Sequence, residues 1–214
     1  YGTQRSWRAR IDLRLEKRGL RTTLPGLLHE GPLRVQRPFY PEGPVCHIYL
    51  LHPPGGLVSG DQLQISVTLM PNSESLITTP SAGKIYKGDS CDVSQQQQVQ
   101  LCLHAGSTLE WLPQETILFD GALGHSQTRV DLTADCRFIG WEIICLGRPA
   151  NKIRFSSGRF LQDMQIYRDG QPLLLEKQHL QAGSPLAEQR WGLQGYPVVA
   201  SLYAFGFDKE PCSL

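Results

Sequence analysis

The residues Trp7-Arg8-Ala9-Arg10-Ile11-Asp12-Leu13-Arg14-Leu15-Glu16 carry the clearest signal for the fold class. Apolar side chains occupy every odd position of this stretch, and charged side chains occupy every even position. A β-strand points successive side chains to opposite faces, so this alternation predicts a strand with one buried and one solvated face.

Similar strand signals recur along the whole chain. They fall at residues 33–37, 45–51, 63–69, 99–103, 108–112, 116–119, 128–132, 137–146, 159–168 and 173–180. The run 45–51 is continuously apolar apart from one His, which predicts a strand buried on both faces. Asp169-Gly170 between two such runs predicts a hairpin turn, and the four-glutamine run 95–98 predicts a polar turn or strand edge.

These signals predict an all-β protein, with many short strands in layered sheets and little helix. The best helix candidate is a short piece near residues 185–189. No linker or fixed-period repeat is visible, so residues 1–214 are expected to form a single domain.

Composition narrows the function classes. The chain has 214 residues with 21 Lys and Arg against 20 Asp and Glu, a net charge of +1. A nucleic-acid-binding protein usually carries a marked basic excess, so we expect no nucleic-acid partner. No run approaches the roughly 18 apolar residues of a membrane-spanning helix, so we expect no membrane partner. The six cysteines form no CxxC pair and read as free thiols, which favours a cytoplasmic location.

Sequence motifs of common catalysts are absent. Ala82-Gly83-Lys84-Ile85 resembles the end of a phosphate-binding loop, but Lys84 is followed by Ile and the first glycine is replaced by Thr78. GxGxxG, GxSxG and HExxH do not occur, so no local signature of these catalytic or nucleotide-binding sites is present. One catalytic alternative stays open, a small β-fold metallohydrolase that uses His52, Asp61 and the pair Cys102/His104.

Carboxylates inside apolar runs are the most informative chemical feature. Glu142 lies in the run 138–146, Glu176 follows Leu173-Leu174-Leu175, and Asp61 follows a turn rich in Pro and Gly at residues 53–60. A buried carboxylate without a partner costs several kcal/mol, so such groups pair with a cation, face water or line a channel. Pairing with Arg148, Lys177 or Arg154 is the structural alternative to a hydrated acidic path for a divalent cation.

Several runs in fixed order resemble one known family, the urease accessory protein UreD, also called UreH. They are Gly31-Pro32-Leu33, residues 36–42, His52-Pro53-Pro54-Gly55-Gly56 through Gly60-Asp61, residues 78–86, residues 109–115 with Phe119, residues 146–149, and residues 170–176. The resemblance covers residues 8 to 200 and is specific only when these runs are taken together.

The resemblance implies a mainly β scaffold for nickel insertion into urease, without catalysis of its own. It implies three partners: the urease apoprotein, a helical UreF-like accessory protein, and a UreG-like GTPase reached through the UreF-like protein. It also implies an internal path for transient Ni²⁺, with no tightly bound cofactor. Asp61, Glu142 and Glu176 fall on acidic motif positions of the family and are expected to line this path.

A second non-catalytic alternative is a passive docking protein that reshapes urease without handling metal. Two departures from the family pattern are visible. Ser59 stands where a Gly is usual, and the chain ends earlier than family members do, so it is either truncated or divergent at its C-terminus.

Overall fold

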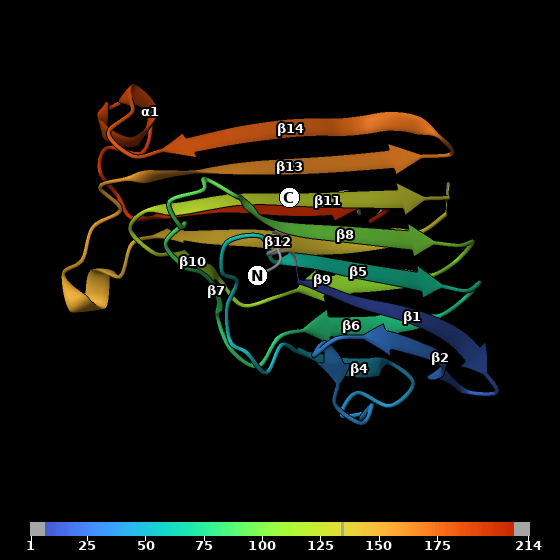
Figure 1. Ribbon diagram of the computed structural model, residues 1–214. Coiled ribbons are helices and arrows are strands. Elements are labelled where there is room, and N and C mark those ends of the chain that lie inside the picture. Colours follow the sequence, from blue (N-terminus) through green and yellow to red (C-terminus); the bar gives the residue numbers. More distant parts are fainter. Residues whose placement is uncertain (1–6, 134, 208–214) are drawn as a thin grey trace.

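Two β-sheets stacked as layers form the molecule (Figure 1). The structure is a computed structural model that describes residues 7–133 and 135–207. The seven-stranded sheet has the spatial order β14 (Gln171–Gln181), β13 (Gly158–Arg168), β11 (Ala122–Leu132), β8 (Gln95–Leu103), β5 (Gln62–Leu69), β1 (Arg8–Arg18) and β2 (Arg21–Glu30). The eight-stranded sheet has the order β3 (Arg34–Val35), β4 (Cys46–Leu51), β6 (Glu74–Thr78), β9 (Thr108–Leu112), β12 (Arg137–Leu146), β10 (Thr116–Leu118) and β7 (Gly83–Ile85), with β15 (Val198–Phe205) paired to β12.

The chain winds between the two layers as a flattened coil. Strands β5, β8, β11 and β13 of one sheet alternate in sequence with β4, β6, β9 and β12 of the other. Neighbours within each of these sets pair in parallel. Antiparallel partners complete the edges, with β2 on β1, β14 on β13 and β15 on β12. The inward side chains of both sheets form one apolar core between the layers.

Stacked turns at one end of the coil repeat with each winding. Ser73, Ser107 and Cys136 lie at equivalent positions of the turns after β5, β8 and β11, and all three are fully buried. Each donates its backbone N–H to the carbonyl three residues earlier, at 3.0 to 3.2 Å. The repeat is therefore structural, and it has no counterpart in a fixed sequence period.

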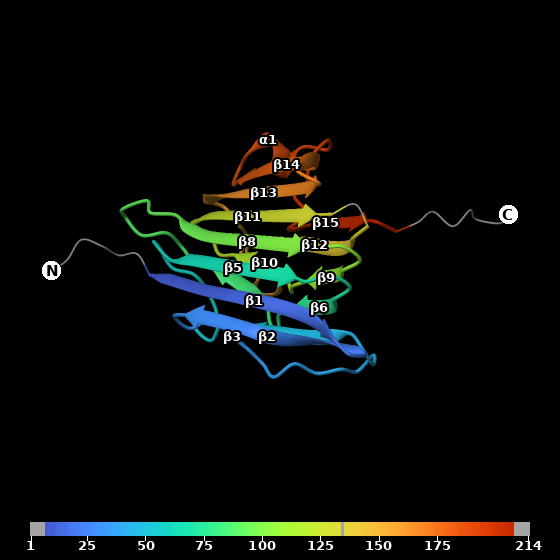
Figure 2. The ribbon, with the colours of Figure 1, turned by 90° about the vertical axis from the view of Figure 1, so that its right-hand side faces the viewer.

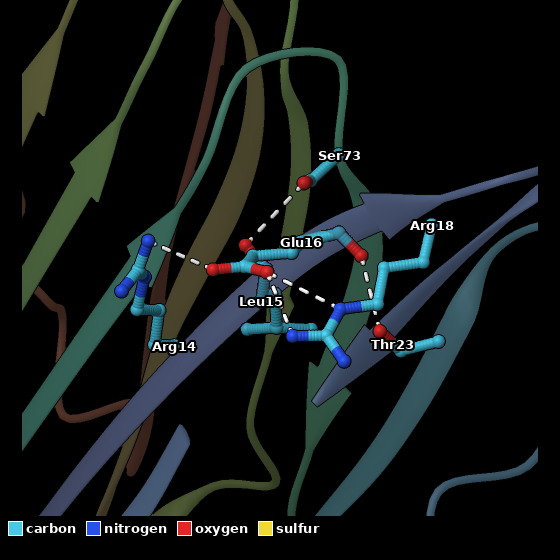
Figure 3. Close-up of polar contacts among 6 residues, drawn as sticks. All are labelled: Arg14, Leu15, Glu16, Arg18, Thr23 and Ser73. Carbon is cyan, nitrogen blue, oxygen red and sulfur yellow. Dashed lines mark hydrogen bonds and ion pairs between the residues drawn. The ribbon is translucent and has the colours of Figure 1, made fainter. Parts of the chain in front are cut away.

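Strand β1 shows how the opening alternation is used. Its odd residues from Ala9 to Leu15 are buried, while the charged residues lie on the outer face and pair with one another. Glu16 accepts ion pairs from Arg14 at 2.8 Å and from Arg18 at 3.1 Å (Figure 3). The Leu15 carbonyl accepts a hydrogen bond from the Ser73 hydroxyl at 3.4 Å, which ties β1 to the turn before β6.

The all-β prediction is confirmed, and the helix within the described residues is confined to α1 (Pro185–Glu188) and a 3-10 turn, Pro149–Asn151. Helix α1 lies beside the β14 edge (Figure 2). The predicted hairpin is also confirmed, because Asp169 and Gly170 both adopt positive φ between β13 and β14. The glutamine run was misjudged, since it forms the first half of β8 and Gln95 is fully buried.

The sequence analysis did not predict four of the strands, which are β2, β6, β7 and β15. Pro25 and Gly26 interrupt the pattern of β2, and β7 is only three residues long. In β15 the side chains of both faces are apolar, so no alternation is visible.

Candidate functional site: an acidic hollow between the sheets

Asp61 is fixed by the turn that precedes β5. Its backbone N–H donates to the Val58 carbonyl at 3.0 Å, and its Oδ2 accepts the Val58 N–H at 2.9 Å. The Asp61 carbonyl accepts the Gln96 N–H at 2.9 Å, which joins the turn to β8. Asp61 is only 8 % exposed. The prediction that this turn holds Asp61 at the start of the next strand is confirmed.

Gly56 lies where the turn leaves no room for a side chain. A Cβ at Gly56 would lie 2.5 Å from the Tyr86 ring and 3.0 Å from the Lys84 carbonyl oxygen. The Leu57 N–H donates to the same carbonyl at 2.8 Å, so the turn packs directly on the backbone of β7.

His52 lies at the start of this turn and faces a cavity. Its Nε2 is buried and has no hydrogen-bond partner among the described residues. Burial lowers the pKa of the His52 ring, and the charge of Asp61 opposes that shift. The ring of Trp7 lies 6.2 Å from that of His52, centre to centre.

Two adjoining cavities occupy the space between the sheets. The first, of about 110 Å³, reaches from His52 and the Gly55–Gly56 turn toward Phe160. The second, of about 80 Å³, reaches Glu142. They share a stretch of wall formed by Leu50, Ile65, Thr79, Gly83, Gln97, Thr116 and Ser126. We call these two cavities together the hollow.

A break in the eight-stranded sheet borders the hollow. The chain leaves the sheet between β6 and β7 at residues 79–82, and again between β9 and β10 at residues 113–115. The two breaks lie side by side, since Gly83 N–H donates to Glu115 O at 2.8 Å and Gln114 N–H to Thr79 Oγ1 at 2.9 Å. Both breaks belong to runs that resemble the accessory family, and Thr79, Gly83 and Gln114 line the hollow.

Glu142 points into the hollow from β12. Thr128 on β11 donates its hydroxyl to Glu142 Oε1 at 2.5 Å, and the Gln162 amide on β13 donates to Oε2. Burial raises the pKa of Glu142, the two donors oppose this, and the charge of Glu176 adds to it. The side chain therefore bridges the two sheets through hydrogen bonds alone.

Glu176 lies on the inward face of β14, close enough for its charge to act on Glu142. Tyr203 on β15 donates its hydroxyl to Glu176 Oε2 at 3.1 Å, and the Gln178 amide donates to Oε1. Tyr203 is 7 % exposed. Its burial, with the nearby charges of both glutamates, raises its pKa to about 12.

The structure therefore brings two of the three predicted residues together. Glu176 lies close enough to Glu142 for its charge to act on it, whereas Asp61 lies at the His52 end. Of the three, only Glu142 lines a cavity of the hollow. The predicted cation partners are not used, because no ion pair joins either glutamate to a cation within the described residues. Lys177 instead pairs with Asp163 at 3.6 Å.

The metallohydrolase constellation is wrong on geometry. Cys102 pairs in register with Thr68, seven residues along β5 from Asp61, which separates them by about 23 Å at the usual rise per residue. His104 follows the end of β8 and is exposed. No group of three His, Cys, Asp or Glu side chains that could hold a metal ion occurs in residues 7–133 and 135–207.

Sequence reasoning missed the polar side chains that donate hydrogen bonds to Glu142 and Glu176. All three donors are buried, and each donates a hydrogen bond to one of the two glutamates: Thr128 and Gln162 to Glu142, and Tyr203 to Glu176. The available signal was a polar residue in the inward phase of an alternating strand, as at Gln162 between Phe160 and Met164.

Comparisons with known proteins identify the class and then the family. Residues 8–213 match the family described as UreD urease accessory protein. Proteins called urease accessory protein UreD from Saccharophagus degradans and Hahella chejuensis are 53 % and 50 % identical over 201 residues. Those matches cover 94 % of this chain and 68 % and 64 % of the two relatives. A UreD from Marinobacter nauticus is 45 % identical over 221 residues, covering all of this chain and 74 % of the relative.

These matches place the chain among accessory proteins rather than among enzymes. It belongs to the UreD urease accessory protein family. It spans about two thirds of the length of these curated relatives. Among the described residues, no helix has the length and apolar character needed to cross a membrane.

Proposed function

We propose that this chain helps to insert nickel into apo-urease, with Ni²⁺ passing through the hollow between the sheets. The observation that carries the proposal is the arrangement of the hollow, whose two adjoining cavities share wall residues and together reach from His52 to Glu142. In this proposal Glu142 lines one end of the path with the charge of Glu176 close to it, and Asp61 stands at the other end. Nickel is cargo here, and no tightly bound cofactor is proposed.

The chemistry of the hollow suits transit better than storage. Cavities of about 110 and 80 Å³ exceed the roughly 30 Å³ that one water occupies, and their walls carry Thr, Ser and Gln side chains. Carboxylate and water oxygens are weak, exchangeable ligands for Ni²⁺, whereas a closed His and Cys site would retain it. Hydrogen bonds to the glutamates come from neutral groups, so no cation competes with the metal for them.

The same proposal includes the partners and the compartment. We assign docking on urease together with a helical UreF-like protein, and contact with a UreG-like GTPase through that protein. An exposed apolar surface supports docking, since Val198 and Leu202 on β15 are 51 % and 69 % exposed and Trp191 and Tyr196 precede them. Five described cysteines are free thiols, which supports a cytoplasmic site of action.

That exposed apolar surface also favours the second candidate, a passive docking role without metal handling. The two candidates differ in what the buried glutamates do. A conduit needs their oxygens, whereas a docking protein needs only the outer surface.

The test is co-expression of urease, the two accessory partners and this chain carrying Glu176→Gln or Glu142→Gln. The control is Glu110→Gln, on the outward face of β9. We measure the complex recovered and the nickel bound per urease. The conduit predicts an intact complex with reduced nickel for both hollow variants and full nickel for the control. Full nickel in all three variants would overturn the conduit in favour of passive docking, and nickel loss in the control would also count against it.

A further inference from the structure

Strand β14 forms a free edge of the seven-stranded sheet. It pairs with β13 on one side, and none of the strands in residues 7–133 and 135–207 pairs with its other side. Helix α1 lies beside only the last residues of this edge (Figure 1). An open strand edge accepts an extended segment of another chain as an added strand, held by backbone hydrogen bonds. The side chains along the edge then decide which segment fits.

The outward side chains of β14 change character along the strand. Leu173 and Leu175, in its first half, are 44 % and 64 % exposed. Lys177 and His179 follow in the same phase of the alternation and are exposed as well. A segment paired with this edge therefore meets two apolar side chains at one end and two basic side chains at the other.

A groove of about 640 Å³ adjoins the basic half of this edge on the outer face of the sheet. Four basic side chains line it: Lys177 and His179 from β14, His125 from β11, and Arg159 from β13. The carboxylate of Asp163 is already engaged, by His125 at 3.0 Å and by Lys177 at 3.6 Å. Arg159 is exposed and forms no ion pair within the described part of the chain. The groove therefore retains positive charge for a ligand.

The loop that leads into this groove adds to its positive charge. Residues 147–162 contain four cationic side chains and no carboxylate. Two of them, Lys152 and Arg154, are exposed on the loop before β13, and neither forms an ion pair with a described residue. The whole chain carries a net charge of only +1, so this basic excess is local. A local basic excess attracts and selects an acidic ligand.

We propose that the β14 edge and the adjoining groove bind an extended acidic segment of a protein partner as an added strand. Carboxylates of that segment lie over Arg159, Lys177 and His179. Its apolar side chains cover Leu173 and Leu175. A second copy of this chain fits less well, because a symmetric contact would bring the basic patches of both copies together.

The inference goes beyond nickel transit and stands without it. The groove lies on the outer face of the seven-stranded sheet, whereas the hollow lies on its inner face, where Phe160 of β13 lines it. The edge is also separate from the exposed apolar surface of β15, which belongs to the other sheet. The molecule thus offers two docking surfaces of different chemistry, one apolar and one basic.

The test is an NMR titration of the unmutated chain with a short capped peptide in which two glutamates and two valines alternate with threonines. The peptide is used with the glutamates first and with the valines first, because an added strand can run in either direction. The matched control peptide carries lysine in place of glutamate. We expect one glutamate peptide to shift the backbone signals of β14 and to slow hydrogen exchange of its edge amides. We expect it to bind at least about tenfold more tightly than the lysine peptide.

A charge-reversal variant tests the groove itself. Arg159→Glu should weaken binding of the glutamate peptide at least about fivefold, because it replaces an attraction with a repulsion. The control is Arg37→Glu, the same change at an exposed position between β3 and β4, far from the β14 edge in the order of strands. It should leave the affinity unchanged within about twofold.

Three results with the unmutated chain would overturn the proposal, and none depends on how a variant folds. Equal binding of the glutamate and lysine peptides would show that charge does not select the ligand. No shift at β14 with either glutamate peptide would show that the edge accepts no acidic strand. A dimer in sedimentation, with the edge amides of β14 already protected from exchange, would show that a second copy occupies the edge.

Discussion

At the His52 end of the hollow, one carboxylate is held by backbone, whereas at the other end two carboxylates are held by side chains. Asp61 takes its hydrogen bond from Val58 N–H within a glycine-rich turn. Glu142 and Glu176 take theirs from Thr128, Gln162, Gln178 and Tyr203, on strands of both sheets. The first arrangement depends on local chain conformation, and the second depends on the register of the two sheets.

This contrast decides how each end responds to mutation. A side-chain donor can be deleted, which leaves a buried carboxylate without its partner. A backbone donor cannot be removed by a side-chain substitution, so the Asp61 end should tolerate changes that the glutamate end does not.

The largest effect is expected for Gln162→Leu. Loss of the amide leaves Glu142 Oε2 buried without a donor and lowers the free energy of unfolding by about 2–3 kcal/mol. Because the pKa of Glu142 is already raised, acid protonates it readily, so the loss should shrink as the pH falls toward the ordinary value of 4.5. Urea unfolding across a pH series measures both the loss of stability and its dependence on pH. Gln165→Leu, on the outward face of β13, is the control and should change stability by less than about 0.5 kcal/mol. Equal losses in the two variants would contradict the contrast.

A smaller loss is expected for Tyr203→Phe. Glu176 keeps the Gln178 donor, so the change should cost about 1–2 kcal/mol at neutral pH. The folded-state pKa of Tyr203 is about 12 against an ordinary 10.0, so native Tyr203 contributes stability that is lost as the pH rises from 10 to 12. The free energy of unfolding, measured from pH 10 to 12, should therefore fall less steeply in the variant than in the unmutated chain. Identical slopes would show that Tyr203 does not carry this dependence, and Tyr196→Phe, at an exposed site, should match the unmutated slope.

The smallest effect is expected for Asp61→Asn. The amide oxygen still accepts the Val58 N–H, so thermal unfolding should change by less than about 0.5 kcal/mol. A loss as large as that of Gln162→Leu would show that the charge of Asp61, and not its hydrogen bond, holds the turn. That result would remove the distinction between the two ends.

The sequence predicted the locally determined features of the molecule better than those that depend on the register of the two sheets. Strand β1 and the Asp61 turn were readable because alternation and Pro-Gly content act locally. The inward phase of Glu142 with Phe138 and Ile144 was also predicted correctly. The hydrogen-bond partners of Glu142 were not predicted, because Thr128 and Gln162 lie on the other sheet and come close to Glu142 only when the chain has folded. Strand β15, apolar on both faces, carried no periodic signal, so Tyr203 was missed with it.

The resemblance to the accessory family added what periodicity could not. It singled out Asp61, Glu142 and Glu176 as one set, and the structure separates that set into a pair and a distant third member. The structure also shows that the catalytic grouping with Cys102 is wrong. Asp61 and Cys102 belong to neighbouring paired strands, but they lie at opposite ends of them.

The central claim is that nickel passes through the hollow, and a plug tests it most directly. Ser126 is 7 % exposed and lines both cavities, so Ser126→Leu fills the shared wall without touching a carboxylate. The control is Ser66→Leu, on the outward face of β5. The measurement is nickel per urease in the purified complex. The account predicts a complete complex with little nickel for Ser126→Leu and normal nickel for the control. A complete complex with normal nickel for Ser126→Leu would contradict it.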